Sequence, residues 1–242
     1  RDPAPAIIFQ GEQRFTSQFS FEEVYDRVSL WAQALAKQGV QKGDRVVGYM
    51  PNMPEAIIAM LATTSLGAIW SSASPDFGPQ GVLDRFGQIK PSVLVTTDKY
   101  YYNGKAIDCL ANVRAIQSEL TTLARTVIVP FTSETPKLAG LTNTSIENDF
   151  LSQYLPKEID FVRLPFNHPL FIMFSSGTTG APKCITHGHG GTLLQHLKEH
   201  RLHCDVRADD RIFYFTTCGW MMWNWLVSAL ASDATLLLYD GS

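Results

Sequence analysis

The chain has 242 residues, of which 45% are hydrophobic and 18% charged, with a formal net charge of -3. These proportions are typical of a globular protein with a sizeable core, and they exclude a disordered chain, a collagen and a disulfide-stapled miniprotein. Neither the net charge nor any run of Lys and Arg favours nucleic acid or anionic lipid, and no apolar stretch approaches the roughly 18 residues that span a bilayer.

Helical and strand-like patterns alternate along the first part of the chain. Ser20 and Glu23 form a capping box before an apolar stripe that ends at Gly39, which predicts a helix. Asn52 is expected to cap a second helix, and Pro79 suits the first turn of a third. Strands are expected at 46–50, 68–70, 93–95 and 127–129, a loop at 131–144, and a fourth helix along Ile107, Leu110, Val113, Ile116 and Leu120.

The same alternation continues to the end of the chain. Apolar runs at 170–174, 212–215 and 236–239 predict strands, residues 184–186 look like a further strand, and helices are expected near 193–197 and around Trp225. Short apolar strands between amphipathic helices predict an α/β fold with mostly parallel sheets covered by helices. Such folds bind ligands at loops beyond the carboxyl ends of their strands.

A loop rich in glycine and hydroxyl groups directly follows the strand at 170–174. Residues 174–183 read Phe-Ser-Ser-Gly-Thr-Thr-Gly-Ala-Pro-Lys. Glycines let backbone N–H groups approach an anion, hydroxyls donate to phosphate oxygens, and Lys183 adds a positive charge. The loop is not a Walker A motif, because Pro182 precedes the lysine and a strand pattern follows it. The alternative is a polar hairpin that binds no ligand. The length of the motif and its fixed order of residues do not favour this alternative.

The loop resembles the phosphate loop of the adenylate-forming superfamily, which includes acyl-CoA synthetases, firefly luciferase and the adenylation domains of peptide synthetases. One position departs from the family pattern, since Cys184 stands where glycine is usual. The resemblance implies that Thr178 and Lys183 act in catalysis. It also implies that the phosphates of ATP are bound by Ser175, Ser176, Gly177, Thr178, Thr179, Gly180 and Lys183.

A second segment, residues 215–225, reads Phe-Thr-Thr-Cys-Gly-Trp-Met-Met-Trp-Asn-Trp and follows a predicted strand. Loops at strand ends are normally polar, so this apolar run favours the wall of an acyl pocket over ordinary core. The run is similar to that of the acetoacetate-activating acyl-CoA synthetases, as are residues 191–200 and 239–242. The resemblance places four residues at the acyl pocket, namely Trp220, Met221, Met222 and Trp223.

The resemblance also implies a site for CoA. In related synthetases the contacts to the CoA nucleotide follow a Thr-x-Asp strand end, which residues 96–98 match. Tyr102 and Lys105 then fall at the two CoA positions, although a basic residue of the family has become Tyr102. A solvated turn is the alternative interpretation of these two side chains.

The implied reaction has two steps. Acetoacetate attacks the α-phosphate of ATP, which carries Mg²⁺, and the acyl-adenylate then passes its acyl group to CoA. The resemblance implies that residues 1–242 are part of the large N-terminal domain of the adenylate-forming fold. This part is expected to be truncated at both ends and to lack the C-terminal lid domain. Two alternatives stay open: a non-catalytic fragment that binds a nucleotide or a partner, and a synthetase for another short-chain acid.

The cysteines and the implied substrates indicate the cellular location and the partners to expect. The four cysteines, at positions 109, 184, 204 and 218, form no C-x-x-C pair, so we expect free thiols and a cytosolic location. The small-molecule substrates make nucleic acid and membrane unexpected partners.

One motif points to a different chemistry. His196 to His200 match H-x-x-E-H, a zinc-protease signature, and His203 could join them one turn later. Such a protease takes a further glutamate as a ligand, and no Glu follows Glu199. We therefore predict no metal site and interpret the motif as the polar face of an exposed helix.

Overall fold

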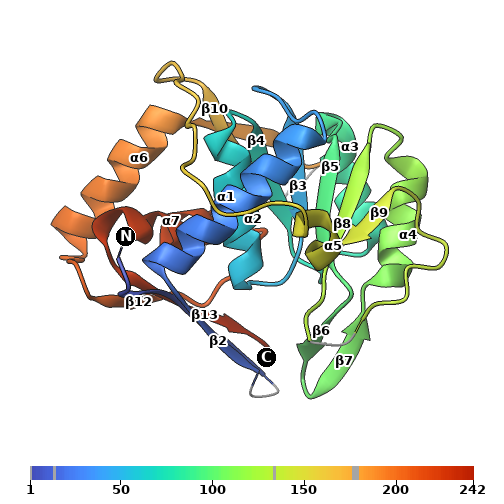
Figure 1. The fold of residues 1–242 in the computed structure, drawn as a ribbon, viewed down its shortest axis with the longest axis horizontal. Helices are drawn as coiled ribbons and strands as arrows, with labels where there is room; N and C mark the ends of the chain where they lie inside the picture. The colour runs from blue at the N-terminus through green and yellow to red at the C-terminus, as the bar shows by residue number, and fades with distance from the viewer. Residues whose placement is uncertain (1, 13–14, 133–134, 176–179) are drawn as a thin grey trace.

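The structure, a computed structural model, describes residues 2–12, 15–132, 135–175 and 180–242 (Figure 1). In this part of the chain the strands form one seven-stranded sheet, one four-stranded sheet and a separate hairpin. Helices lie on the faces of the sheets, as the alternating pattern predicts. No helix in these residues is long and apolar enough to cross a membrane.

The larger sheet is parallel except at one edge. Neighbouring strands pair in parallel throughout, apart from the hairpin of β10 and β11. The strands at its centre are buried on both faces, which explains why they read as continuous apolar runs. In the spatial order of the sheet the strands are β11 (Cys184–Gly188), β10 (Pro169–Phe174), β4 (Ile69–Ala73), β3 (Arg45–Tyr49), β5 (Val93–Thr97), β8 (Arg125–Val129) and β9 (Thr144–Ile146).

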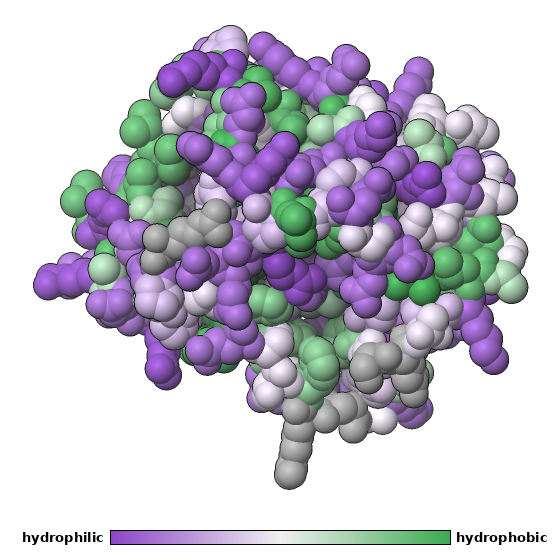
Figure 2. All heavy atoms as spheres, viewed as in Figure 1, coloured by the Kyte–Doolittle hydropathy of each residue, from purple (hydrophilic) through white to green (hydrophobic). Residues whose placement is uncertain are grey.

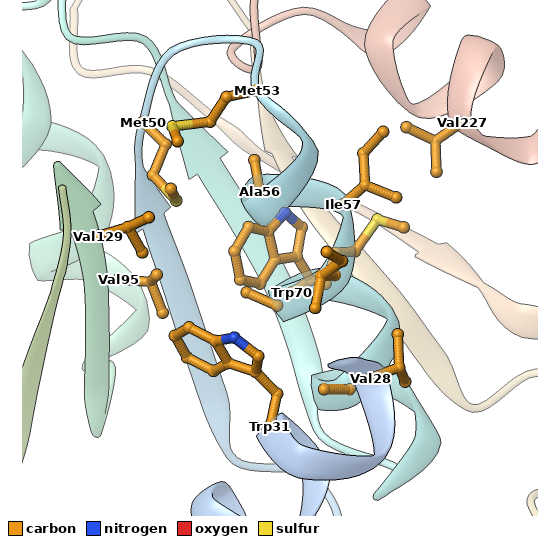
Figure 3. Close-up of a cluster of buried hydrophobic side chains, with 14 of the residues drawn as sticks. Val28, Trp31, Met50, Met53, Ala56, Ile57, Trp70, Val95, Val129 and Val227 are labelled. Carbon is orange, nitrogen blue, oxygen red and sulfur yellow. The ribbon is translucent and has the colours of Figure 1, made fainter. Parts of the chain in front are cut away.

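Helices cover both faces of the larger sheet. α1 (Phe21–Lys37) and α2 (Pro54–Ser65) pack on one face, and α3 (Pro79–Ile89) and α4 (Leu110–Glu119) pack on the other. The sheet therefore separates two hydrophobic clusters. α2 is buried on all sides, whereas α1, α3 and α4 each bury one apolar face. Figure 3 shows part of the first cluster, in which Trp31, Ile57, Trp70 and Val95 pack together from α1, α2, β4 and β5.

The smaller sheet joins the two ends of the chain. It contains β12 (Arg211–Phe213), β13 (Thr235–Asp240), β1 (Pro5–Gly11) and β2 (Thr16–Ser20) in that order, with β1 parallel to β13. The 3-10 turn η2 (Ser228–Ser232) packs on β13, and α6 (His189–Lys198) and α7 (Met221–Val227) pack on η2. The π-helical turn η1 (Glu199–His203) continues α6. A short helix, α5 (Glu147–Leu151), packs on α1 and β8.

The predicted α/β fold is confirmed, and several element boundaries are confirmed with it. α1 begins at the predicted capping box, in which Ser20 and Glu23 bond each other's backbone N–H groups. α3 begins with Pro79, and the strands β5, β8, β10 and β13 contain the predicted apolar runs.

Three predictions of local structure are wrong. Asn52 does not cap α2, whose N-cap residue is Met53. The fourth helix begins at Leu110 rather than at Ile107, because residues before it form the hairpin β6 (Lys99–Tyr102) and β7 (Lys105–Asp108). β12 ends at Phe213 rather than at 215. The apolar spacing of Ile107 suits a helix, but the turn residues Asn103 and Gly104, both with positive φ, favour the hairpin.

Candidate functional site

The carboxyl ends of strands from both sheets meet at one edge of the molecule. β3, β4 and β5 run in parallel, so the loops that follow them lie side by side. The segments after β12 and β13 reach the same place, where a cavity of about 330 Å³ is lined by Asn52, Asp76, Tyr102, Thr216 and Asp240, among others. The meeting of two sheets therefore creates the concave surface that a ligand requires.

The predicted phosphate loop is the connection of the β10–β11 hairpin. At its base the backbone N–H of Ser175 donates to the carbonyl of Lys183 (3.0 Å), and the backbone N–H of Lys183 donates to Ser175 Oγ (3.1 Å). Gly180 has a φ of 152°, which favours glycine. Ser176, Gly177, Thr178 and Thr179 lie outside the described residues.

The Lys183 side chain is exposed, and in the described part of the chain it has no ion-pair partner. A lysine presented at the base of a glycine-containing hairpin is suited to a polyphosphate.

Gln88 on α3 fixes the outgoing arm of this hairpin. Its amide Nε2 donates to the carbonyl of Pro182 (2.8 Å), and its Oε1 lies 3.6 Å from Cys184 Sγ. The cysteine that departs from the family pattern is thus exposed and held against α3. These contacts join residues 182–184 to α3, which covers one face of the larger sheet.

The predicted acyl segment divides into exposed and buried side chains. Trp220 and Met221 are 64% and 46% exposed, and Met222 is partly buried. Trp223 has no exposed surface at all, and its indole N–H donates to Asn52 Oδ1 (2.9 Å). Trp223 thus packs in the hydrophobic core, whereas the other three residues of the predicted acyl segment keep exposed surface.

The predicted CoA residues sit opposite each other at the tip of the β6–β7 hairpin. Tyr102 and Lys105 are register partners, and both are exposed. Tyr102 also lines the 330 Å³ cavity. The turn between them is held by Glu12, whose Oε2 accepts from the backbone N–H of Gly104 (3.1 Å).

Acidic and phenolic groups near the cavity were not predicted from the sequence. The Tyr100 hydroxyl lies 3.2 Å from Asp76 Oδ1, and burial raises the pKa of Tyr100. Burial also raises the pKa of Asp240 to about 7. The rule that ligands bind beyond the carboxyl ends of parallel strands could have singled out Asn52, Asp76 and Asp240, since each follows or ends a strand.

The histidines of the H-x-x-E-H motif have a different environment from the one predicted. His196 and His200 are buried rather than exposed, at 6% and 0%. His196 Nδ1 lies 2.7 Å from Ser228 Oγ, and the His200 ring lies 4.4 Å from that of Trp225. Burial lowers the pKa of His196 to about 4, so the ring is neutral at pH 7. Within the described residues no group of three His, Cys, Asp or Glu side chains could hold a metal ion.

Comparisons with known proteins agree with this fold. A solved structure, acetoacetyl-CoA synthetase from Streptomyces lividans, superimposes with a TM-score of 0.92 at 41% identity, covering 99% of this chain and 36% of that one. The acetoacetyl-coenzyme A synthetase of Rhizobium meliloti (strain 1021) is 56% identical over 98% of this chain and 36% of the relative. A malonamoyl-CoA synthetase of Penicillium aethiopicum is 41% identical over 100% of this chain and 34% of the relative.

The chain thus spans about a third of the length of these relatives. A family profile described as AMP-binding enzyme matches residues 2–242, nearly the whole sequence. The chain therefore belongs to the AMP-binding enzyme family.

Proposed function

We propose that this chain is part of an AMP-forming acyl-CoA synthetase that activates acetoacetate. The reaction joins the acid to the α-phosphate of ATP, releases pyrophosphate, and then exchanges AMP for CoA. The observation that carries the proposal is the β10–β11 hairpin, which presents Lys183 beside a glycine- and hydroxyl-rich loop. The 56% identity to an acetoacetyl-coenzyme A synthetase supports the choice of acid.

The residues of the hairpin fit the phosphates of ATP. Ser175 and Lys183 close the base of the loop through two hydrogen bonds. We assign phosphate binding to these residues and to Gly180, together with Ser176, Gly177, Thr178 and Thr179 outside the described part. Lys183 and Thr178 stabilise the charge that develops on the α-phosphate, and Mg²⁺ enters with ATP as part of the substrate.

The other two substrates approach from the loops beyond the strand ends. Trp220, Met221 and Met222 contact the acid in this proposal, since they begin α7 and keep surface outside the core. Tyr102 and Lys105 contact CoA at the tip of the β6–β7 hairpin. The buried Trp223 acts only as support for the helix.

The similarity to a malonamoyl-CoA synthetase makes malonamate a second candidate substrate. Acetoacetate and malonamate are both short carboxylic acids with a carbonyl group two carbons from the carboxylate carbon, and they differ only in a terminal methyl or amino group. An amino group adds two hydrogen-bond donors, and a site built for methyl leaves them unpaired. We therefore expect acetoacetate to be the better substrate, with malonamate as the second candidate.

Pyrophosphate exchange with the full-length enzyme tests the proposal. Acetoacetate, malonamate and butyrate are compared at equal concentrations, and CoA thioesters are then measured. Butyrate has the length of acetoacetate without its ketone, so it reports the contribution of that group. A preference for malonamate would replace the proposed substrate, and the absence of exchange with all three acids would contradict the proposal.

We further propose that the enzyme is longer than this chain and acts in the cytosol. The relatives are about three times as long, and all four cysteines of the chain are free. The 242 residues by themselves are expected to show no turnover, because catalysis in this family needs the lid. Steady thioester formation by the isolated chain would contradict this, and nucleotide binding without turnover would match the alternative of a non-catalytic fragment.

A further inference from the structure

Asn52 lies beside the start of α2 but does not cap it. Asparagine is among the best N-cap residues, yet the N-cap position is taken by Met53, which makes no side-chain bond. Asn52 is only 3% exposed, so its amide must find partners in the interior. The partners it finds come from distant parts of the chain.

The polar atoms of Asn52 contact three separate elements. Oδ1 accepts a hydrogen bond from the indole N–H of Trp223 on α7 (2.9 Å). Nδ2 lies 3.4 Å from the carbonyl of Thr216, after β12, and 3.5 Å from that of Tyr239, on β13. One side chain thus joins the larger sheet to both ends of the segment Thr216–Trp223.

Two neighbouring bonds hold the middle of the same segment. Ser72 Oγ, at the end of β4, donates to the carbonyl of Cys218 (2.7 Å). The Cys218 thiol in turn lies 3.3 Å from the carbonyl of Pro51. The segment is therefore fixed at its centre and at both ends, and Met221 and Met222 stand between the fixed points.

We propose that Asn52 is a positioning residue for acid binding, acting through Trp223 on Met221 and Met222. The inference rests on the proposed function of these methionines. Trp223 is fully buried and adjoins Met222 in the first turn of α7, so a shift of its indole turns the helix that carries both methionines. Within the described residues none of the Asn52 bonds reaches the β10–β11 hairpin, so ATP binding should not depend on them.

A double-mutant cycle in the full-length enzyme tests this role. Asn52→Leu removes the acceptor, and Trp223→Phe removes the indole donor while keeping an aromatic ring. Each variant is expected to raise the KM for acetoacetate by about tenfold in pyrophosphate exchange, with the KM for ATP changed less than about twofold. Because both variants remove the same bond, the double variant is expected to be little worse than the poorer single variant.

Thr235→Val is the matched control for a lost buried hydrogen bond. Thr235 Oγ1 donates to the carbonyl of Pro5 (2.6 Å) at the opposite end of β13. This variant should lower the melting temperature without a rise in either KM. Equal rises in both KM values for Asn52→Leu, or effects that multiply in the double variant, would overturn the inference. A wild-type enzyme that activates no acid would overturn the proposed function as well, so the two failures are distinguishable.

Discussion

Trp223 and Met221 are two positions apart on α7 and have opposite environments. The first has no exposed surface, whereas the second is 46% exposed. Consecutive helical residues are separated by about 100° around the axis, so residues i and i+2 face in nearly opposite directions. An apolar run at the start of a helix cannot all face one pocket, which explains why the methionines and Trp223 separate.

Lys183 carries the clearest prediction for a single side chain. Its ammonium group is proposed to offset charge on the α-phosphate as the acyl-adenylate forms. Lys183→Ala is expected to slow adenylation by about 10²- to 10³-fold in pre-steady-state assays with the full-length enzyme, the size for loss of one well-placed charged donor. Lys198→Ala is the control, because Lys198 is exposed and pairs with Glu199 instead. Unchanged adenylation in Lys183→Ala would remove the lysine from the phosphate site.

Asp240 gives a prediction about pH. Its pKa is raised from 3.8 to about 7, mainly because burial disfavours the charged carboxylate. A raised pKa in the folded state gives stability that is complete below about pH 4 and is lost as pH rises through about 7.

Asp240→Asn removes this dependence, because the amide stays neutral at every pH. Relative to the wild-type protein, the free energy of unfolding of the variant is expected to improve between pH 4 and 7 and to level off above pH 7, by at most about 4 kcal/mol. Urea melts at a series of pH values measure it. Asp160→Asn, at an exposed position, is the control. A difference that is the same at every pH would show that the carboxylate does not titrate as stated.

At the scale of elements, close packing between neighbouring strands decides which residues are tolerated. Gly48 on β3 faces the indole of Trp70 on β4, and an added Cβ would lie 2.6 Å from Trp70 Cζ2. Trp70 is fully buried and is surrounded by the first hydrophobic cluster, so its ring has no space to retreat (Figure 3).

Gly48→Ala is therefore expected to destabilise the protein by about 1–3 kcal/mol through overpacking. Gly87→Ala in α3 is the matched control, since no atom lies within 4 Å of the added Cβ. There alanine should stabilise the helix by about 0.5–1 kcal/mol. Chemical denaturation of both variants makes the comparison, and equal effects would contradict the packing argument.

At the scale of the whole molecule, one partly buried cation joins three helices. Arg27 on α1 lies 3.1 Å from Glu55 on α2 and 2.7 Å from Glu147 on α5, and Glu147 also accepts from the indole of Trp31 (2.9 Å). Burial raises the pKa of Glu55 despite the nearby guanidinium. These hydrogen bonds and ion pairs connect α5 to α1 and α2.

Arg27→Met is expected to lower the free energy of unfolding by about 3–5 kcal/mol at pH 7, because two buried carboxylates lose their partner. Without the guanidinium the pKa of Glu55 rises further in the folded state, because Arg27 no longer opposes the effect of burial. The deficit should therefore shrink as the pH falls towards about 5 and the Glu55 carboxyl takes up a proton. Arg207→Met, which breaks an exposed pair with Asp205, should cost less than about 1 kcal/mol. Similar losses in the two variants would contradict the role of burial.

The surface also shows features that local patterns do not reveal. Figure 2 shows a largely hydrophilic face with apolar side chains grouped towards α6, where Leu193 and Leu194 are exposed. His196, on the same helix, and His200, in the following turn η1, are buried. The exposed-helix interpretation assumed the reverse, because the spacing of His196 and His200 indicates that they share a face but not which face is covered.

The sequence by itself determined the features that depend on neighbouring residues. The capping box of α1, the apolar strands and the order of residues in the phosphate loop are local patterns, and they were sufficient to predict the α/β fold and the place of the hairpin. Only the tertiary structure decided the hydrogen-bond partners of Asn52, the burial of Trp223 and the environment of Asp240. Asn52 and Trp223 are 171 positions apart. A preference for helix caps is intrinsic to asparagine, but its choice between a cap and a distant indole depends on which groups the fold brings within hydrogen-bonding distance.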